Sequence, residues 1–380
     1  MKITRLETFF VKPRWVFLKM HTDAGLVGWG EPVVEGWSRT TAMAVEEMGR
    51  YLIGKDPRRI EHHWQALYRG GFYRGGPVLC SALSGIEQAM WDITGKALGV
   101  PVHQLLGGAV RDRIKVYAHV GGQDQDGYAV SGKKRLEQGF TALKASPFGA
   151  VRFVETPAFV EQAVARIAAL REAVGDAADI GIDFHGRVSP PMAVQFAKAL
   201  EPFRPMFIEE PCLPENVDAM AAIARATSIP VATGERLFTK WGFREVLEKQ
   251  AAAILQPDVS HAGGILETRK IAAMAEAYYA AIAPHCPLGP ISLAACLQVD
   301  ACTPNFLCQE QVSLGEGYLV TPFEVVAGHI AVPGGPGLGI EVDEQAVADK
   351  LYDGGWETPR LWHDERSAYP PLYRLPSHTP

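Results

Sequence analysis

Ionisable side chains recur at a regular interval through the second half of the chain, each just after a short apolar run. The six residues are Asp183, Glu209, Glu235, Asp258, His285 and Glu310. Neighbouring members are 23 to 27 residues apart, about the length of one strand–helix unit. The carboxyl ends of parallel barrel strands meet at one rim. This spacing therefore predicts that six consecutive strands deliver these groups to a single site.

The first three members of the series are carboxylates. A single acid at a strand end usually caps the next helix or faces solvent, but three on neighbouring strands repel one another unless a cation lies between them. Carboxylate oxygens suit Mg²⁺, and zinc is disfavoured because no His or Cys shares these three strand ends. We predict that Asp183, Glu209 and Glu235 bind Mg²⁺, with Glu210 as the alternative to Glu209 after a one-residue slip.

Two histidines are candidates for proton transfer. Asp258 and His285 end adjacent predicted strands, and a carboxylate beside an imidazole fixes its tautomer and raises its basicity, which predicts a general base. His185 follows Asp183 by two residues and would point the same way if the strand continued. In a ring of eight strands the two histidines lie on opposite sides. One could remove a proton while the other protonates a leaving group.

Glu310 follows the strand next to that of His285. If burial raises the pKa of Glu310, its carboxyl group could donate a hydrogen bond to developing negative charge; the alternative is a structural salt bridge. We expect His119 and most other histidines to be ordinary hydrogen-bonded residues, and His261 is assigned no role.

The elements that must position these residues are an α/β barrel and a capping domain. Eight candidate strands lie at 116–120, 140–144, 179–183, 206–209, 230–235, 252–257, 281–285 and 305–310. Amphipathic helical segments alternate with them, which indicates parallel strands and a closed (β/α)8-type barrel. We predict an α+β capping domain over 1–115, the barrel over 116–325, and a C-terminal segment over 326–380 that packs back on the cap.

The capping domain has its own signals. Runs 15–22 and 26–31 flank the turn Asp23-Ala24-Gly25, which predicts a hairpin, and 3–11 supplies a third strand. Apolar residues at three- and four-residue steps over 83–97 predict a helix that ends at Gly99.

Composition excludes several classes of protein. The net charge is −6 with a pI near 6.0, so there is no basic surface for nucleic acid. No apolar run is long enough to span a membrane, and no nucleotide-binding glycine motif is present. The six cysteines form no Cys-x-x-Cys pair, which favours buried thiols in a cytoplasmic protein.

Several motifs together resemble a known family. They are Gly71–Pro77, Met90–Lys96, Leu105–Gly108, Gly181–Arg187, Phe207–Pro211, Gly234–Arg236, Leu255–Gly264 and Ala283–Pro290. In this order they resemble the mandelate-racemase branch of the enolase superfamily, and within it the galactonate dehydratases. The resemblance covers almost the whole chain. It implies an α+β cap over a modified (β/α)7β barrel and a reaction that starts by removing the proton α to a metal-bound carboxylate.

The resemblance also implies roles for individual residues. Positions matching Asp183, Glu209 and Glu235 bind Mg²⁺, and His285 is the base with Asp258 behind it. The position matching His185 is the acid that expels the 3-hydroxyl, and Glu310 supports the enediolate. The expected reaction is therefore dehydration of a sugar acid, most simply D-galactonate to its 2-keto-3-deoxy acid. Another aldonic acid of the gluconate or mannonate type is the first alternative, and a catalytically silent sugar-acid-binding protein is the second.

One departure from the branch argues against racemisation. Racemases of the branch carry Lys-x-Lys after the second strand, whereas this chain has Lys144-Ala145-Ser146, so a second base is absent and Lys144 is left as an electrostatic helper. Arg14 and Tyr73 in the cap are candidates for substrate contact. Capped barrels of this kind commonly associate, so a homo-oligomer is expected.

Overall fold

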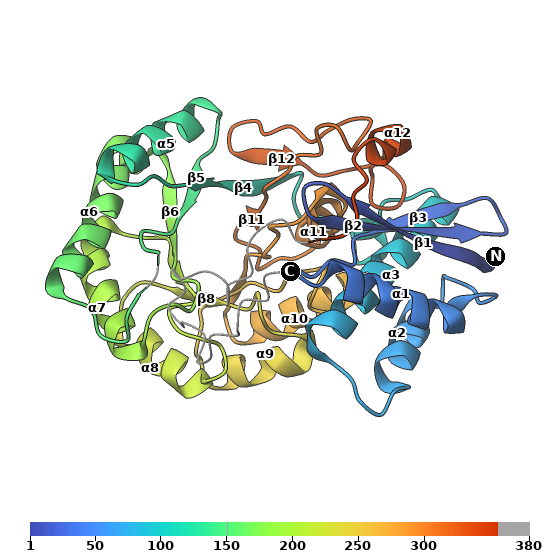
Figure 1. Ribbon diagram of the computed structural model, residues 1–380, viewed down its shortest axis with the longest axis horizontal. Helices are drawn as coiled ribbons and strands as arrows, with labels where there is room; N and C mark the ends of the chain where they lie inside the picture. Colours follow the sequence, from blue (N-terminus) through green and yellow to red (C-terminus); the bar gives the residue numbers. More distant parts are fainter. Residues whose placement is uncertain (150, 356–380) are drawn as a thin grey trace, which may run out of the picture.

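The structure is a computed structural model that describes residues 1–149 and 151–355. It has two parts. An N-terminal part combines a three-stranded sheet with helices, and a larger part is a curled parallel sheet ringed by helices (Figure 1). Both parts were predicted from the strand and helix patterns, and the fold class is confirmed.

The N-terminal part contains an antiparallel sheet and four helices. Its strands are β1 (Ile3–Val11), β2 (Trp15–Thr22) and β3 (Val27–Gly30). Its helices are α1 (Ser38–Leu52), α2 (Ile60–Arg69), α3 (Gly76–Leu98) and α4 (Val102–Leu105). The predicted hairpin turn is present between β2 and β3. Helix α3 ends as predicted at Gly99, whose φ of 71° is a left-handed conformation that favours glycine.

The barrel contains eight parallel strands. They are β4 (Arg113–Val120), β5 (Ala142–Ala145), β6 (Asp179–Asp183), β7 (Phe207–Glu209), β8 (Val231–Thr233), β9 (Ile254–Leu255), β10 (Ala281–Ile282) and β11 (Gln309–Glu310). The ladder runs from β10 back through β4 to β11. A parallel bridge between Ile282 and Phe306 joins its two ends, so the ring closes.

Seven helices connect these strands. They are α5 (Gln125–Glu137), α6 (Pro157–Val174), α7 (Pro190–Leu200), α8 (Val217–Ala226), α9 (Thr239–Glu248), α10 (Ile265–Ala277) and α11 (Pro290–Ala301). Short 3₁₀ turns follow α6 at Gly175–Ala177 and α7 at Glu201–Phe203. After β11 the chain passes instead to β12 (His329–Ala331), which pairs antiparallel with β4. In the described part of the chain this is a (β/α)7β barrel.

The last strands are shorter than predicted. The predicted run 252–257 contains only β9, and 281–285 contains only β10. Pro257 and Pro284 lack the N–H group that a ladder needs, which limits these strands. Asp258 and His285 therefore lie on the loops that follow β9 and β10.

The C-terminal segment contacts both parts. Leu351 forms an antiparallel bridge with Val11, and Lys12 N donates to Lys350 O at 2.9 Å, while β12 lies on the barrel. Within it, α12 (Glu344–Ala348) is a short helix that the sequence patterns did not predict. Residues 356–380 of the predicted segment lie outside the described residues, and the domain boundaries at 115 and 325 remain predictions. No helix in the described ranges is both long and apolar enough to cross a membrane.

Candidate active site

Three carboxylates lie at the carboxyl ends of neighbouring barrel strands. Asp183 and Glu209 are the last residues of β6 and β7 and are direct register partners. Both are buried, at 3% and 0% exposure. Glu235 follows β8 after Gly234. Only glycine fits at position 234, because its φ is 142° and a Cβ atom there would lie 2.9 Å from Gln256 N. The strand ends thus bring the three predicted metal ligands to one rim.

A buried lysine lies among these acids. Lys144 Nζ is 2.8 Å from Glu209 Oε1, 2.9 Å from Glu310 Oε1 and 3.7 Å from Asp183 Oδ2. Burial alone would lower the pKa of Lys144, but Glu209 and Glu310 outweigh it and raise that pKa well above its usual value. The ammonium group therefore stays charged and neutralises part of the cluster.

Lys144 does not fully offset the burial and mutual repulsion of Asp183 and Glu209. Burial, and next the charge of Asp183, raise the pKa of Glu209 to about 7. Burial also raises the pKa of Asp183; Lys144 opposes this rise, and Glu235 adds to it. Buried carboxylates that repel one another on adjacent strands are a suitable donor set for a hard divalent cation.

The side chains of Glu209 and Asp183 contact other side chains of the protein in this structure. Glu209 Oε2 accepts from Gln256 Nε2 at 2.7 Å, and Asp183 Oδ2 is 3.2 Å from His185 Nε2. Across residues 1–149 and 151–355, no group of three or more His, Cys, Asp and Glu side chains is arranged to hold a metal ion. The chemistry of the donors fits Mg²⁺, and the carboxylates would have to turn toward it from these partners.

Glu210, the alternative to Glu209, has a different partner. It follows β7 with φ of 41°, and its carboxylate is paired with the Arg236 guanidinium, with Arg236 Nε 3.2 Å from Glu210 Oε1. Glu209 is the one that contacts Lys144 and Gln256. The structure therefore places Glu209 beside Asp183 and engages Glu210 with arginine.

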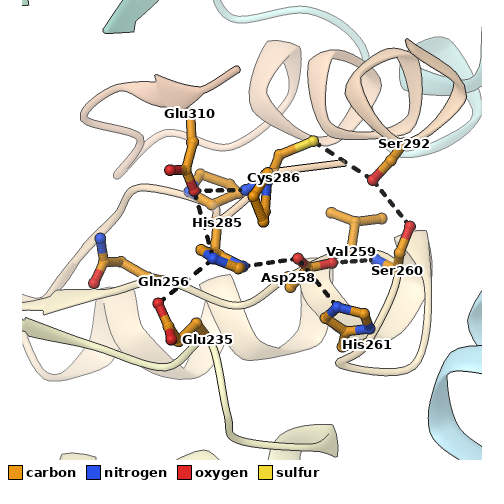
Figure 2. Close-up of polar contacts among 12 residues, drawn as sticks. Glu235, Gln256, Asp258, Val259, Ser260, His261, His285, Cys286, Ser292 and Glu310 are labelled. Carbon is orange, nitrogen blue, oxygen red and sulfur yellow. Dashed lines mark hydrogen bonds and ion pairs between the residues drawn. The ribbon is translucent and has the colours of Figure 1, made fainter. Parts of the chain in front are cut away.

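Asp258 and His285 form a hydrogen-bonded pair (Figure 2). His285 Nδ1 is 2.8 Å from Asp258 Oδ2, while His285 Nε2 faces Glu235 Oε2 at 3.5 Å and Glu310 Oε2 at 3.7 Å. Burial opposes the charged imidazolium, but Glu310, Glu235 and Asp258 outweigh it and raise the pKa of His285 well above its usual value. The imidazole is oriented by Asp258 on one nitrogen and presents the other to the carboxylates.

His185 lies at the opposite edge of the carboxylates by a different route from the one predicted. We expected the strand to continue, but β6 ends at Asp183 and His185 has φ of 53°. The turn is held by Asp183 Oδ1, which accepts from His185 N at 2.8 Å. The side chain is 44% exposed, and desolvation lowers the pKa of His185 to about 4. The imidazole is therefore neutral near pH 7.

The condition for hydrogen-bond donation by Glu310, a pKa raised by burial, is not met, and the alternative of a salt bridge is what the structure shows. Burial would raise the pKa of Glu310, but Lys144, His285 and His119 together hold it well below its usual value. Oε1 contacts Lys144 at 2.9 Å and His119 Nε2 at 2.8 Å, and Oε2 accepts from Cys286 N at 2.9 Å. Glu310 is an ionised acceptor and cannot donate a hydrogen bond as proposed from the sequence.

Two residues at this rim were not predicted. His119, expected to be an ordinary hydrogen-bonded residue, is bonded to Glu310, and Gln256 is bonded to Glu209. Both follow the same signal as the acids, since each lies at the carboxyl end of its predicted strand. His261, which was assigned no role, is 3.6 Å from Asp258 Oδ2 through its Nε2.

The three predicted substrate contacts have different environments. Lys144 is inside the cluster. Arg14 donates to Pro287 O at 3.1 Å and pairs with Glu35 at 3.0 Å, so it lies over the loop that follows His285. Tyr73 is 86% exposed, and its ring contacts Phe72. Substrate contact by these residues stays a prediction.

Sequence families match both parts of the chain. Residues 7–107 match the N-terminal domain of mandelate racemase / muconate lactonizing enzyme, and residues 128–346 match the enolase C-terminal domain-like family. D-galactonate dehydratase of Ralstonia nicotianae is 50% identical over 97% of this chain and 99% of its own length. D-galactonate dehydratase of Variovorax paradoxus is 52% identical, with the same shares covered.

Solved structures show the same fold. A mandelate racemase/muconate lactonizing enzyme from Sulfitobacter sp. superposes with a TM-score of 0.89 at 36% identity, covering 93% of this chain and 96% of that one. A mandelate racemase/muconate lactonizing enzyme-like protein from Roseovarius sp. TM1035 has a TM-score of 0.86 at 38% identity, with 93% and 97% covered.

Proposed function

This chain belongs to the mandelate racemase / muconate lactonizing enzyme family of the enolase superfamily, and from that premise we propose that it dehydrates D-galactonate. The product would be the 2-keto-3-deoxy acid, formed by loss of the C2 proton and the 3-hydroxyl. The near-full-length identity to D-galactonate dehydratases supports the substrate, and the site supports the type of reaction.

The main observation in support of this reaction is that two imidazoles contact two different acids of the same cluster. His185 Nε2 is 3.2 Å from Asp183, and His285 Nε2 is 3.5 Å from Glu235. A β-elimination needs one group to take a proton and another to protonate the leaving hydroxyl. These two contacts support assigning the two roles to the two histidines.

Asp183, Glu209 and Glu235 are the residues that would hold Mg²⁺. When bound, Mg²⁺ would supply positive charge that acidifies the C2 proton of the sugar acid and offsets the charge developing on its carboxylate. Lys144, already beside Glu209 and Glu310, would add a second positive charge at the same rim. In this proposal the charge-stabilising role expected of Glu310 passes to Lys144, which Glu310 holds in place.

His285 is the proposed base. Asp258 accepts from Nδ1–H, which fixes the tautomer and leaves Nε2 to take the C2 proton. The surrounding carboxylates raise the pKa of His285 strongly. Positive charge at the rim would lower this pKa toward neutral pH, so that the imidazole can be uncharged and accept a proton. This dependence links the base to occupation of the cation site.

His185 is the proposed acid. Its left-handed backbone turns the side chain back to Asp183, and its exposed edge faces solvent, from which it can be protonated. Desolvation leaves this imidazole neutral near pH 7 in the structure, so the proposed role requires the negative charge of a bound sugar acid to raise the pKa of His185 before it protonates the departing hydroxyl. The lack of a Lys-x-Lys pair supports elimination over two-base racemisation.

A panel of aldonic acids tests the proposal. Purified protein would be assayed for 2-keto acid formation from D-galactonate, D-gluconate and D-mannonate with Mg²⁺, and again after chelation with EDTA. We expect turnover of D-galactonate that stops with EDTA and returns with Mg²⁺. Turnover of gluconate or mannonate alone would reassign the substrate, and no turnover of any acid would favour a silent sugar-acid-binding protein.

Two further properties belong to this proposal. We propose a cytoplasmic protein, because all six cysteines are free and buried, as suits a reducing compartment. We also propose a homo-oligomer, a property that gel filtration with light scattering would measure.

A further inference from the structure

Helix α3 of the N-terminal part carries a polar stripe that is fully buried. Ser81, Ser84 and Gln88 recur at steps of three and four residues, so they share one face of the helix, and each is 0% exposed. Buried polar groups destabilise a protein unless they are hydrogen-bonded. The partners of this stripe therefore show what it does.

Gln88 reaches the proposed base pair through one serine. Gln88 Nε2 donates to Ser260 Oγ at 3.0 Å, and Ser260 N donates to Asp258 Oδ1 at 2.8 Å. Ser260 Oγ also lies 2.9 Å from Ser292 Oγ, on the helix that follows His285 (Figure 2). Asp258 is thus fixed through one oxygen by Ser260 and through the other by His285.

Ser81 reaches the same carboxylate through a histidine. Ser81 Oγ is 2.8 Å from His261 Nδ1, and His261 Nε2 is 3.6 Å from Asp258 Oδ2. A hydroxyl that donates to Nδ1 leaves the imidazole proton on Nε2, the nitrogen that faces Asp258. Figure 2 shows His261 and Ser260 beside Asp258, on the side away from His285.

Gln88 is also connected, through Glu31, to the segment that follows His285. Its Oε1 accepts from Glu31 N at 2.8 Å, and the Glu31 carboxylate accepts from Gly289 N at 2.6 Å and Ser292 N at 2.9 Å. Gly289 and Ser292 flank the start of α11, just after the loop that carries His285. One glutamine in the N-terminal part therefore supports both the Asp258 loop and the His285 loop.

We propose that Gln88, acting through Ser260, is a positioning residue for the Asp258–His285 pair. This inference rests on the proposed function, in which His285 takes the C2 proton. The N-terminal part would then contribute to proton transfer at the barrel rim by holding the base, in addition to covering the site. The hydrogen bonds of the Gln88 side chain go to Glu31, Val259 and Ser260 and to none of the predicted metal ligands.

Three variants test this role. Gln88→Leu removes the hydrogen bonds of Gln88 to Glu31, Val259 and Ser260. Ser260→Ala removes only the serine hydroxyl, with its bonds to Gln88 and Ser292, and is the milder change. Ser84→Ala is the matched control, because Ser84 lies on the same stripe and accepts from Gly263 N at 3.0 Å without touching Ser260 or Asp258. For the first two variants we expect kcat and C2-proton exchange to fall by about 10- to 100-fold with KM changed less than about threefold, as for other outer partners of active groups.

A spectroscopic readout makes the test independent of turnover. In protein carrying ¹⁵N-histidine, the hydrogen-bonded Nδ1 proton of His285 is assigned by its loss in His285→Asn. We expect this resonance to shift or broaden in Gln88→Leu and Ser260→Ala and to stay in place in Ser84→Ala. An unchanged resonance in Gln88→Leu, or equal losses of kcat in all three variants, would overturn the positioning role. If the wild-type protein dehydrated no aldonic acid, the proposed function would fail, and the resonance would still decide whether Gln88 positions the pair.

Discussion

Lys144 shows how one side chain can determine the charge balance of a site. Its ammonium group lies within 2.9 Å of both Glu209 and Glu310, and all three side chains are almost fully buried. Removing one partner of a buried ion pair leaves the other charge uncompensated, which typically costs about 3–5 kcal/mol. Lys144 therefore stabilises the fold wherever the cation site is empty.

We predict that Lys144→Met lowers the free energy of unfolding of chelator-treated protein by about 3 kcal/mol. The control is Lys249→Met, because Lys249 pairs with Asp218 and Glu245 at the surface, where solvent screens such pairs and they contribute little. Urea unfolding in EDTA measures both variants. Added Mg²⁺ should recover part of the loss at Lys144; equal losses for the two variants would contradict the prediction.

The two histidines should separate into two partial reactions. We predict that His285→Asn slows exchange of the C2 proton of D-galactonate with solvent by at least about 100-fold, because the base is gone. His185→Asn should keep that exchange and lose keto-acid formation, because only the departing hydroxyl lacks its acid. Deuterium incorporation and keto-acid assays follow the two steps separately.

His329→Asn is the matched control for both changes, since His329 pairs with Lys115 near the amino end of β4, away from the rim, and its ring Nδ1 lies 2.7 Å from Ala327 O. It should leave both steps unchanged. Loss of exchange and dehydration to the same extent in His185→Asn would argue against separate roles.

The positions of the acidic residues were predictable from sequence, but their charge states were not. Strand-end spacing located Asp183 and Glu209, because each βα unit has a nearly constant length. The pKa of Glu310 depends on Lys144 and His119, which come from strands more than 160 residues earlier in the chain. Only closure of the ring brings β11 beside β4, so a local pattern carries no information about these partners.

At the scale of elements, periodicity predicted the apolar face of α3 but not its other faces. Ile86 and Met90 recur as an apolar stripe should, yet Ser84, Glu87 and Gln88 are equally buried. A polar residue on a predicted helix is normally assigned to solvent. Their burial is possible because the loop after β9 and the start of α10 supply hydrogen-bond partners, and these contacts join segments about 175 residues apart.

Two acids of the N-terminal part cap helices of the barrel. Glu87 accepts from Ile265 N and Leu266 N, the first residues of α10, at 2.8 and 2.9 Å. Glu31 does the same at α11 through Gly289 N and Ser292 N. The oxygens of these two acids accept from N–H groups that have no partner within their helices. These contacts tie the two parts together beside the loops of Asp258 and His285.

We predict that Glu31→Gln lowers the free energy of unfolding by about 1–3 kcal/mol, because an amide can accept through one oxygen only and leaves one buried N–H unpaired. Urea unfolding measures the change. Glu47→Gln on the exposed face of α1 is the control and should change stability by less than about 0.5 kcal/mol. A loss no larger than that of the control would show that Glu31 does not cap α11.

At the scale of the whole molecule, buried acids link stability to pH. Burial raises the pKa of Glu31 to about 8 and that of Glu87 to about 7, whereas both groups have ordinary values near 4.5 when unfolded. Between pH 4.5 and these raised values the folded protein binds more protons than the unfolded chain. The free energy of unfolding must therefore fall as pH rises through this window. His285 acts in the same direction above its usual pKa, and the lowered pKa of His185 acts oppositely only on the acid side.

We predict that chelator-treated protein is less stable at about pH 8.5 than at about pH 6, by up to about 1.4 kcal/mol per pH unit for each carboxyl that titrates in between. Urea unfolding at both pH values in EDTA measures the slope. Glu31→Gln should flatten the slope, because a glutamine has no proton to release, while Glu47→Gln should leave it unchanged. Stability that rises with pH in the wild-type protein would mean that these acids are already ionised in the fold, and the helix caps would then be carboxylates throughout the neutral range.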